Sequence, residues 1–420
     1  MDRHHQRQWG SVDLRRSGAA HVAIGGTAYQ LKINSQGAID VISPAPSQLL
    51  PAAYYSRLGP IGDLVQDPDV TEVMVMGTRD VYVEVRGQLH LTDAHFRDED
   101  ELLHLIRYIV ESVGRRIDEQ SPLCDARLKD GSRVHAAIRP VAVDGPMLTI
   151  RKFARNPLQV ADLVALGTCT ETGFAFLQAC VAARANILIS GGTASGKTTL
   201  LNVLSGFIPA GERIVTIEDA AELQLRQRHV ARLETRGAGL DGRGQITVRD
   251  LVISSLRMRP DRLVVGEVRG PEALDMLQAM NTGHDGSMTT IHANRTRDAL
   301  HRVETLVMMA GADLQAKSIR QQVAAAFHVL VHMEREIDGS RKIIGISEIT
   351  GMEEDTITMQ EIFRFGRAGS TSDGRIQGRF EPSGLRPRIL DRLHGMGLAP
   401  PEQLEQLFPS YLGAGPRATV

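Results

Sequence analysis

Residues 191–199 spell GGTASGKTT, the pattern of a phosphate-binding loop. They follow an apolar run, 186–190, and precede a helix-like stretch, 199–204. A glycine-rich turn between strand and helix lets successive backbone N–H groups surround an anion, and the helix N-terminus adds partial positive charge. In this pattern the lysine reaches the β- and γ-phosphates and the next threonine ligates Mg²⁺. We therefore expect the chain to bind ATP through Gly191, Gly192, Thr193, Ala194, Ser195, Gly196, Lys197, Thr198 and Thr199.

Length and composition limit the class of protein. A chain of 420 residues has room for two or three domains, and 42% hydrophobic with 23% charged residues is ordinary for a globular protein. The net charge of −2 favours neither nucleic acid nor an anionic membrane. Three cysteines without a C-x-x-C pair indicate a reducing compartment and exclude a zinc ribbon. No apolar run could span a bilayer and no signal peptide begins the chain, so we expect a cytoplasmic protein.

The pattern of polar and apolar residues divides the chain. We expect a weakly ordered extension over 1–57, an α+β domain over 58–153, a linker over 154–160, a larger domain over 161–395 and a tail over 396–420. In the larger domain, apolar strands alternate with amphipathic helices, which is typical of a mostly parallel, helix-covered sheet. Its expected strands are 186–190, 213–217, 230–233, 263–265 and 287–291, and its expected helices include 249–256, 272–280 and 297–309. Antiparallel strands are expected at 329–333, 342–347 and 356–359.

Two of the expected strands end in acidic residues. Because the carboxyl ends of parallel strands meet where ligands bind, Glu218, Asp219 and Glu222 are expected near the nucleotide's Mg²⁺. Glu267 ends a second such strand, where a carboxylate can hold the Mg²⁺ shell through water and orient the attacking water. We expect Glu267 in that role, with Glu218 as the competitor. Solvated acids at strand ends are the alternative interpretation.

Histidines and arginines supply further candidates. His284 and His292 bracket one strand, and either imidazole could contact a γ-phosphate or be a hydrogen-bonded structural histidine. Their spacing of eight does not match a helical zinc pair. Ten arginines against five acids between residues 226 and 269 could clamp phosphate oxygens or form a solvated face. A nucleic-acid groove is disfavoured because no aromatic residues interleave with these arginines.

Together these motifs resemble the ATPases of type II and type IV secretion and type IV pilus assembly, with the tight-adherence (Flp/Tad) pilus branch as the closest match. The resemblance covers roughly residues 58–395. It is carried by the phosphate loop, by 216–223 (TIEDAAEL), by 256–269 (LRMRPDRLVVGEVR), by 281–294 (NTGHDGSMTTIHAN), and by 125–134 and 149–153 in the smaller domain.

The resemblance implies an α/β, RecA-like P-loop ATPase domain behind a smaller α+β domain, assembled as a ring of six subunits. It implies that the smaller domain's Arg127, Arg133 and Arg151 reach the phosphates, with Arg257 and Arg269 acting from the motor domain. His292 would join the catalytic group and His284 the nucleotide contacts. Mg²⁺ would be held by Thr198, Glu218, Asp219 and Glu267, mostly through water. The expected partners are identical subunits and platform proteins of the inner membrane, on its cytoplasmic face.

Three other functions stay open. The first is a type IV secretion ATPase that exports protein or DNA–protein substrates, because its motor motifs are the same. The second is a RecA-like nucleic-acid motor, which would need a basic channel. The third is a nucleotide-gated switch with negligible turnover.

Overall fold

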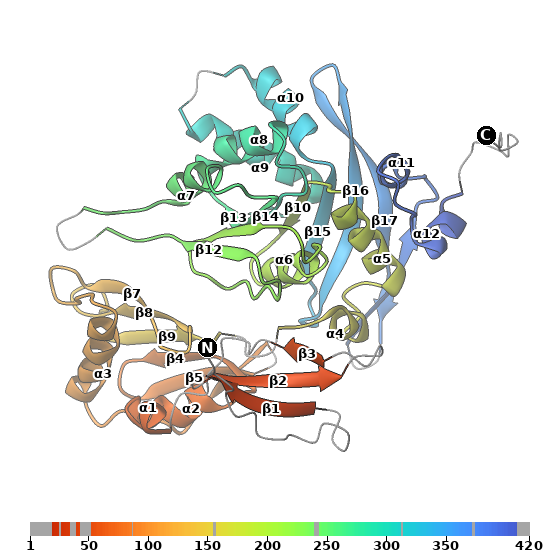
Figure 1. Ribbon diagram of the computed structural model, residues 1–420. Helices are drawn as coiled ribbons and strands as arrows, with labels where there is room; N and C mark the ends of the chain where they lie inside the picture. The colour runs from red at the N-terminus through yellow and green to blue at the C-terminus, as the bar shows by residue number, and fades with distance from the viewer. Residues whose placement is uncertain are drawn as a thin grey trace, which may run out of the picture.

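The computed structural model describes residues 19–24, 27–33, 39–42, 52–85, 87–153, 157–238, 243–311, 314–371 and 374–409 (Figure 1). Within the expected N-terminal extension it contains a three-stranded antiparallel sheet in the order β1-β2-β3. These strands are β1 (Ala19–Ile24), β2 (Thr27–Ile33) and β3 (Ile39–Ile42). The rest of the expected extension up to residue 51, residues 154–156 of the expected linker and residues 410–420 of the expected tail lie outside the described residues.

The smaller domain is an antiparallel sheet covered by helices. The strand order is β6-β5-β4-β9-β8-β7. The strands are β4 (Val70–Met76), β5 (Asp80–Val85), β6 (Gln88–Leu91), β7 (Leu123–Arg127), β8 (Arg133–Ala137) and β9 (Met147–Arg151). The helices are α1 (Ala52–Ser56), the short 3₁₀ helix η1 (Gly59–Ile61), α2 (Gly62–Gln66) and α3 (Glu99–Ser112).

Helix α3 shows why the chain folds locally as it does. The Asp98 side chain caps the helix by accepting a hydrogen bond of 2.8 Å from the backbone N–H of Glu101. Leu102, Ile106 and Ile109 follow at helical spacing and are buried against the sheet. The cap and the buried apolar face together account for the helix over Glu99–Ser112.

The larger domain is a nine-stranded sheet. Its order is β12-β11-β13-β14-β10-β15-β16-β17-β18, parallel from β12 to β15 and antiparallel beyond. The strands are β10 (Ile187–Gly191), β11 (Ile214–Glu218), β12 (Val230–Glu234), β13 (Arg262–Val268), β14 (Met288–His292), β15 (Val329–Arg335), β16 (Arg341–Glu353), β17 (Thr356–Ser370) and β18 (Ile376–Pro382).

Helices cover both faces of this sheet, each over its own apolar core (Figure 1). One core is shared with α4 (Val160–Ala165), α5 (Glu171–Ala182), α6 (Lys197–Ser205), α11 (Arg388–Gly395) and α12 (Glu402–Leu407). The other is shared with α7 (Val248–Ser255), α8 (Glu272–Asn281), α9 (Thr296–Met309) and α10 (Ala316–Ala326). In the described part of the chain, no helix is both long and apolar enough to cross a membrane.

The C-terminal region differs from the expected one. Strand β17 continues through the glycine- and arginine-rich segment after Gly366 and pairs with β18, which the sequence analysis did not anticipate. Helix α12 lies beyond residue 395, in the expected tail. Its Leu404, with the following Phe408, is fully buried in the core that contains the phosphate-loop helix α6. The packed larger domain thus extends past residue 395.

Replacement of Leu404 by alanine tests this packing. A fully buried leucine leaves a cavity when truncated, so L404A should lower the free energy of unfolding by about 2–5 kcal/mol. The control is Q403A, because Gln403 is exposed on the same helix and its replacement should change stability by less than about 0.5 kcal/mol. Urea unfolding followed by circular dichroism measures both. Equal stabilities of the two variants would contradict a packed α12.

Candidate nucleotide-binding site

The phosphate loop joins β10 to α6 through a turn that depends on glycine. Strand β10 ends at Gly191 and α6 begins at Lys197. A Cβ atom on Gly191 would lie 2.4 Å from the Met333 carbonyl oxygen, so no larger residue fits between β10 and β15. Gly196 caps the helix with φ of 96°, a conformation that L-residues disfavour. The turn leaves the first amides of α6 at the end of a buried strand.

Side chains of the loop hold its backbone in shape. The Ser195 hydroxyl donates to the Gly192 carbonyl at 2.9 Å. The Lys197 ammonium donates to the carbonyls of Gly191 at 3.0 Å and Gly192 at 2.9 Å. Burial lowers the pKa of Lys197, and Glu267 partly opposes that shift. The lysine therefore lies over the loop and is only partly exposed to water.

Glu218 ends β11 and is almost entirely buried. Its Oε1 accepts hydrogen bonds from the backbone N–H groups of Glu222 at 2.8 Å and Leu223 at 3.0 Å. Its buried Oε2 has no hydrogen-bond partner among the described residues. Burial raises the pKa of this carboxyl to about 7, and the two N–H groups oppose the shift. Gly266 on the neighbouring strand β13 lies beside this carboxyl group. A Cβ atom added to Gly266 would lie 3.0 Å from Glu218 Cγ, so a larger residue there would crowd Glu218.

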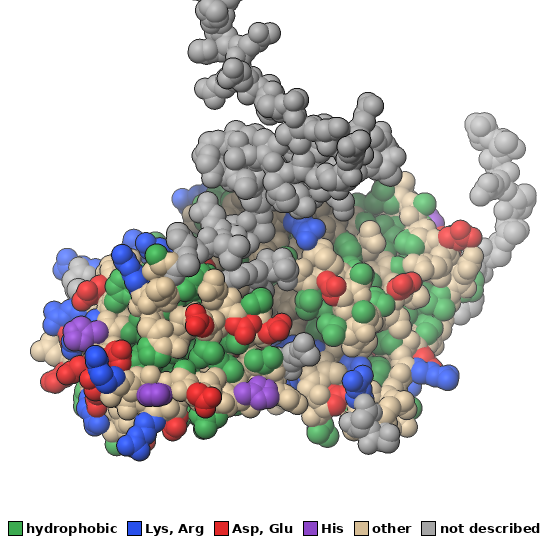
Figure 2. Space-filling view, turned by 90° about the horizontal axis from the view of Figure 1, so that it is seen from below, with side chains coloured by type: hydrophobic (Ala, Val, Ile, Leu, Met, Phe, Trp, Pro, Cys, Tyr) green, Lys and Arg blue, Asp and Glu red, His purple; other side chains and the backbone are tan. Residues whose placement is uncertain are grey.

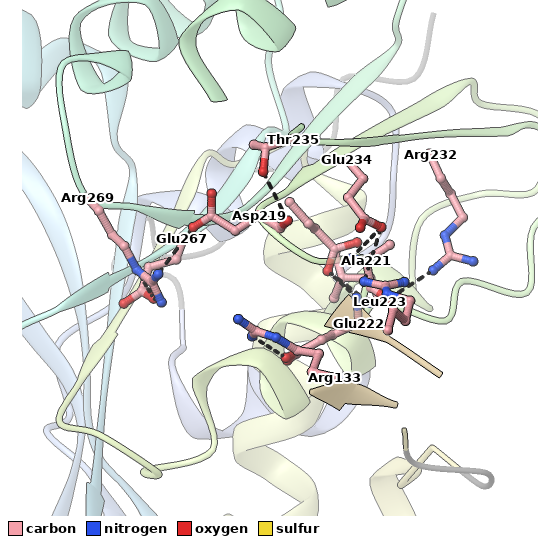
Figure 3. A network of polar contacts seen from close by, with 12 residues as sticks. Arg133, Asp219, Ala221, Glu222, Leu223, Arg232, Glu234, Thr235, Glu267 and Arg269 are labelled. Carbon is pink, nitrogen blue, oxygen red and sulfur yellow. Dashed lines mark hydrogen bonds and ion pairs between the residues drawn. The ribbon is translucent and has the colours of Figure 1, made fainter. Parts of the chain in front are cut away.

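Glu267 lies on the adjacent strand β13, within a bulge between Val265 and Val268. Arg269 donates to Glu267 Oε2 through Nε at 2.7 Å and through Nη2, and Arg269 Nη1 lies 3.2 Å from Asp219 Oδ2 (Figure 3). Burial would lower the pKa of Arg269, but Glu267 and Asp219 outweigh it and raise the pKa. One arginine thus joins acids from the ends of two parallel strands.

The smaller domain faces these acids with arginines. Arg133 forms an ion pair of 3.0 Å with Glu222, and Arg127 forms one of 3.1 Å with Glu234 (Figure 3 shows the first pair). Arg151 on β9 lies directly opposite Arg133 on the neighbouring strand β8. The three arginines and Glu234 line a cavity of about 790 Å³ between the domains, together with Asp219 and Arg269.

A second cavity lies beside the start of α6. It has a volume of about 230 Å³, and Thr198, Thr199, Arg133 and Arg151 contribute to its wall with Phe153 and Leu158. The structure therefore brings two residues from the first turn of α6, and two of the three predicted smaller-domain arginines, to one space.

Three predicted residues lie elsewhere or at the margin. His292 ends β14 and pairs in register with Gly191, so its backbone lies beside the start of the loop, although its side chain is exposed. Arg257 follows α7, is exposed and lines neither cavity. His284 precedes β14, where its Nδ1 is 3.2 Å from the Ala279 carbonyl oxygen. Because β14 spans about 16 Å, His284 lies at the opposite edge of the sheet from the loop, and the structure does not bring it into the group.

Two contacting residues were absent from the sequence analysis. Glu234, the partner of Arg127, ends edge strand β12, and its position at a parallel strand end could have suggested it. Arg341 donates through Nε to the Ala194 carbonyl in the phosphate loop at 2.9 Å. It lies 147 residues further along the chain, and no local motif marks it.

The site offers hydrogen-bond donors that could bind an anion, and it offers carboxylate oxygens. Among the described residues it has no preformed metal cage. In the described ranges, no group of three or more histidine, cysteine, aspartate or glutamate side chains could hold a metal ion. A Mg²⁺ ion suits such a place because it keeps most of its waters and shares phosphate oxygens, using one or two protein ligands. The unpaired Oε2 of Glu218 and the Thr198 hydroxyl fit that limited role.

Comparison with known proteins agrees with this geometry. A sequence model of the family described as "Type II/IV secretion system protein" matches residues 55–373. The chain belongs to this family. Protein Rv3659c of Mycobacterium tuberculosis is 38% identical over 70% of this chain and 85% of its own length. The type IV secretion system protein VirB11 of Bartonella quintana is 29% identical over 70% of this chain and 92% of its own.

The fold of this secretion family member is also found in solved structures. The pilus retraction motor PilT, crystallised with bound ADP, superposes with a TM-score of 0.51 and 18% identity, covering 68% of this chain and 81% of that one. The likeness confirms the predicted α/β fold class, a RecA-like P-loop domain with a smaller N-terminal domain.

The raised pKa of Glu218 predicts a pH-dependent stability. An unfolded glutamate has a pKa near 4.5, so between pH 4.5 and about 7 the unfolded chain loses this proton while the folded chain keeps it. The folded state is therefore destabilised as pH rises through that window. Relative to E218Q, the wild-type free energy of unfolding should fall by about 2–3 kcal/mol between pH 5 and 7.5. Urea unfolding without nucleotide or Mg²⁺ measures it, and parallel pH profiles would contradict the assignment.

Proposed function

We propose that this secretion family member is an ATPase that powers a membrane-bound secretion or pilus machine from the cytoplasmic face of the membrane. The observation that carries the proposal is the phosphate loop, with Lys197 folded over it, at the same sheet edge as Glu218 and Glu267. The arginines of the smaller domain face this edge across a cavity. That combination suits a polyphosphate ligand, because Arg133 and Arg151 share the cavity beside the start of α6 with Thr198 and Thr199.

Different residues of the chain would have different roles in phosphoryl transfer. The loop amides and Lys197 would bind the phosphates, and Thr198 with Glu218 would hold Mg²⁺, which when bound neutralises charge on the phosphate oxygens. Glu267 would orient the attacking water, since Arg269 holds its carboxylate in place near the end of β13. Glu218, whose pKa lies near 7, is less suited to be a permanently ionised base. We therefore propose Glu267, rather than Glu218, as the residue that orients the water.

The smaller domain would complete the site by closing on the phosphates. Arg133 and Arg127 are held by the motor-domain acids Glu222 and Glu234, so their ion pairs already join the two domains. Arg151 lines both cavities between them. We infer that the chain works as a ring of six copies, in which rigid-body movement of the two domains is passed to a membrane platform protein.

Two kinds of membrane machine are candidates for the system that this ATPase would power. We propose the tight-adherence (Flp/Tad) pilus, because that is the branch which residues 58–395 resemble most closely as a whole. A type IV secretion system is the second candidate, favoured by the similarity to VirB11. Neighbouring genes for a short pilin and two small polytopic membrane proteins would support the pilus, and genes for a conjugation apparatus would overturn it.

A nucleic-acid motor is a weaker candidate. On the face of the molecule seen in Figure 2, acidic and basic side chains are interspersed rather than gathered by sign. The net charge of −2 agrees with that distribution. Stimulation of the ATPase by DNA would favour this candidate over the secretion machines.

Two substitutions separate binding from hydrolysis. K197A should abolish nucleotide binding, because it removes the ammonium that faces the loop. E267Q should keep binding of a fluorescent ATP analogue within about threefold and lower kcat by roughly 10³-fold, because the amide cannot act as a base. Equilibrium titration and phosphate release measure the two quantities. Wild-type turnover in K197A would refute the phosphate-loop assignment, and wild-type turnover in E267Q would remove Glu267 from the chemistry.

Arg151 provides a test of domain closure. R151A should lower kcat by roughly 10²-fold and change nucleotide affinity far less, because an arginine that completes the site stabilises charge in the transition state. The control is R139A, since Arg139 is an exposed arginine of the same domain paired with Glu99 and outside both cavities. An equal loss of affinity and kcat in R151A would show that this arginine only binds substrate.

A further inference from the structure

The hairpin between β15 and β16 reaches the phosphate loop from the far end of the sequence. Arg341, the first residue of β16, donates through Nε to the Ala194 carbonyl oxygen at 2.9 Å. Its Cδ lies 3.4 Å from the position that a Cβ on Gly196 would occupy. The side chain therefore lies along the loop and contacts two of its residues.

The backbone that carries Arg341 is fixed by its own turn. The N–H of Glu336 donates to the Ser340 carbonyl at 2.7 Å across the hairpin. Asp338 accepts from the Ser340 N–H at 2.9 Å and from the Ile376 N–H at 2.7 Å, which ties the turn to β18. The position of the Arg341 backbone relative to the phosphate loop is thereby fixed.

The carbonyl that Arg341 holds belongs to a strained residue. Ala194 has a φ of 56°, in the left-handed region, which costs a non-glycine residue roughly 1–2 kcal/mol. Because the peptide unit is planar and trans, fixing the Ala194 C=O also fixes the direction of the Ser195 N–H, one of the loop amides. The bond from Arg341 thus stabilises a loop conformation that the sequence alone disfavours.

Positive charge gathers around this contact. Arg335 lies directly opposite Arg341 in the β15–β16 register and donates to the Gly87 carbonyl of the smaller domain at 3.2 Å. Burial lowers the pKa of Arg341, and Arg335 and Arg151 lower it further, while Glu84 opposes them. The structure tolerates this concentration of cations beside the loop, although opposed like charges on neighbouring strands are unfavourable.

We propose that Arg341 is a positioning residue of the nucleotide site, which holds the phosphate loop at Ala194 in the conformation that receives phosphates. This inference rests on the proposed nucleotide-binding function. Arg341 acts through the loop backbone, so its loss affects every nucleotide whose phosphates the loop amides bind. Arg335, one strand away with the same charge but bonded to Gly87, provides the matched control.

The test compares R341M with R335M in the full chain, by titration with fluorescent ADP and with a fluorescent nonhydrolysable ATP analogue. R341M should weaken both ligands by about tenfold and to the same extent, and R335M should weaken them by no more than about twofold. R341K should recover much of the loss, because an ammonium can donate to the same carbonyl. Should R341M not fold, R341Q against R335Q makes the same comparison with the same expected order.

A double-mutant cycle with A194G tests whether Arg341 acts through the backbone conformation at residue 194. Glycine adopts a positive φ without strain, so R341M in the A194G background should cost less than threefold. A tenfold cost in both backgrounds would mean that Arg341 does not act through the conformation at residue 194. Equal effects of R341M and R335M, or a loss confined to the triphosphate, would likewise overturn the proposal.

The outcomes separate this inference from the function on which it rests. Wild-type affinity in R341M, with binding abolished in K197A, would overturn the role of Arg341 and leave the nucleotide site in place. Failure of the wild-type chain to bind either nucleotide would overturn both.

Discussion

Parallel pairing of β10 with its neighbours is the constraint on which the rest of the structure depends. Register places Gly191 beside His292 on one side and Met333 on the other. Parallel strands end together, so the phosphate loop, Glu218 and Glu267 share one edge of the sheet. The close approach of β15 to Gly191 leaves no space for a side chain, and the same pairing brings the β15–β16 hairpin to the loop.

Cationic side chains at this edge of the sheet donate to carbonyl or carboxylate oxygens of the protein itself. Lys197 and Arg341 donate to loop carbonyls, and Arg269, Arg133 and Arg127 are paired with carboxylates. A polyphosphate would compete for these donors, so its binding would loosen ion pairs that now join the smaller domain to the motor domain.

Local patterns were sufficient for much of the fold. The apolar runs that became β10, β11 and β14 lie within one residue of their predicted bounds, because buried parallel strands consist of short, continuous apolar segments. The local pattern of polar and apolar residues did not predict β18 or α12. Strand β18 is an exposed edge rich in polar residues, and α12 has too few apolar positions to show helical periodicity. Both are stabilised by contacts with distant segments, which no local window contains.

Local sequence was enough to predict a phosphate loop between a strand and a helix, and acids after the neighbouring strands. Those features are local, because a turn needs glycine and a buried strand needs apolar residues. Only the tertiary structure decided which distant residues reach the loop. It joined Arg133 to Glu222 and Arg341 to Ala194, and it placed His284 at the opposite edge. These outcomes follow from strand order and register, which arise when the whole sheet assembles.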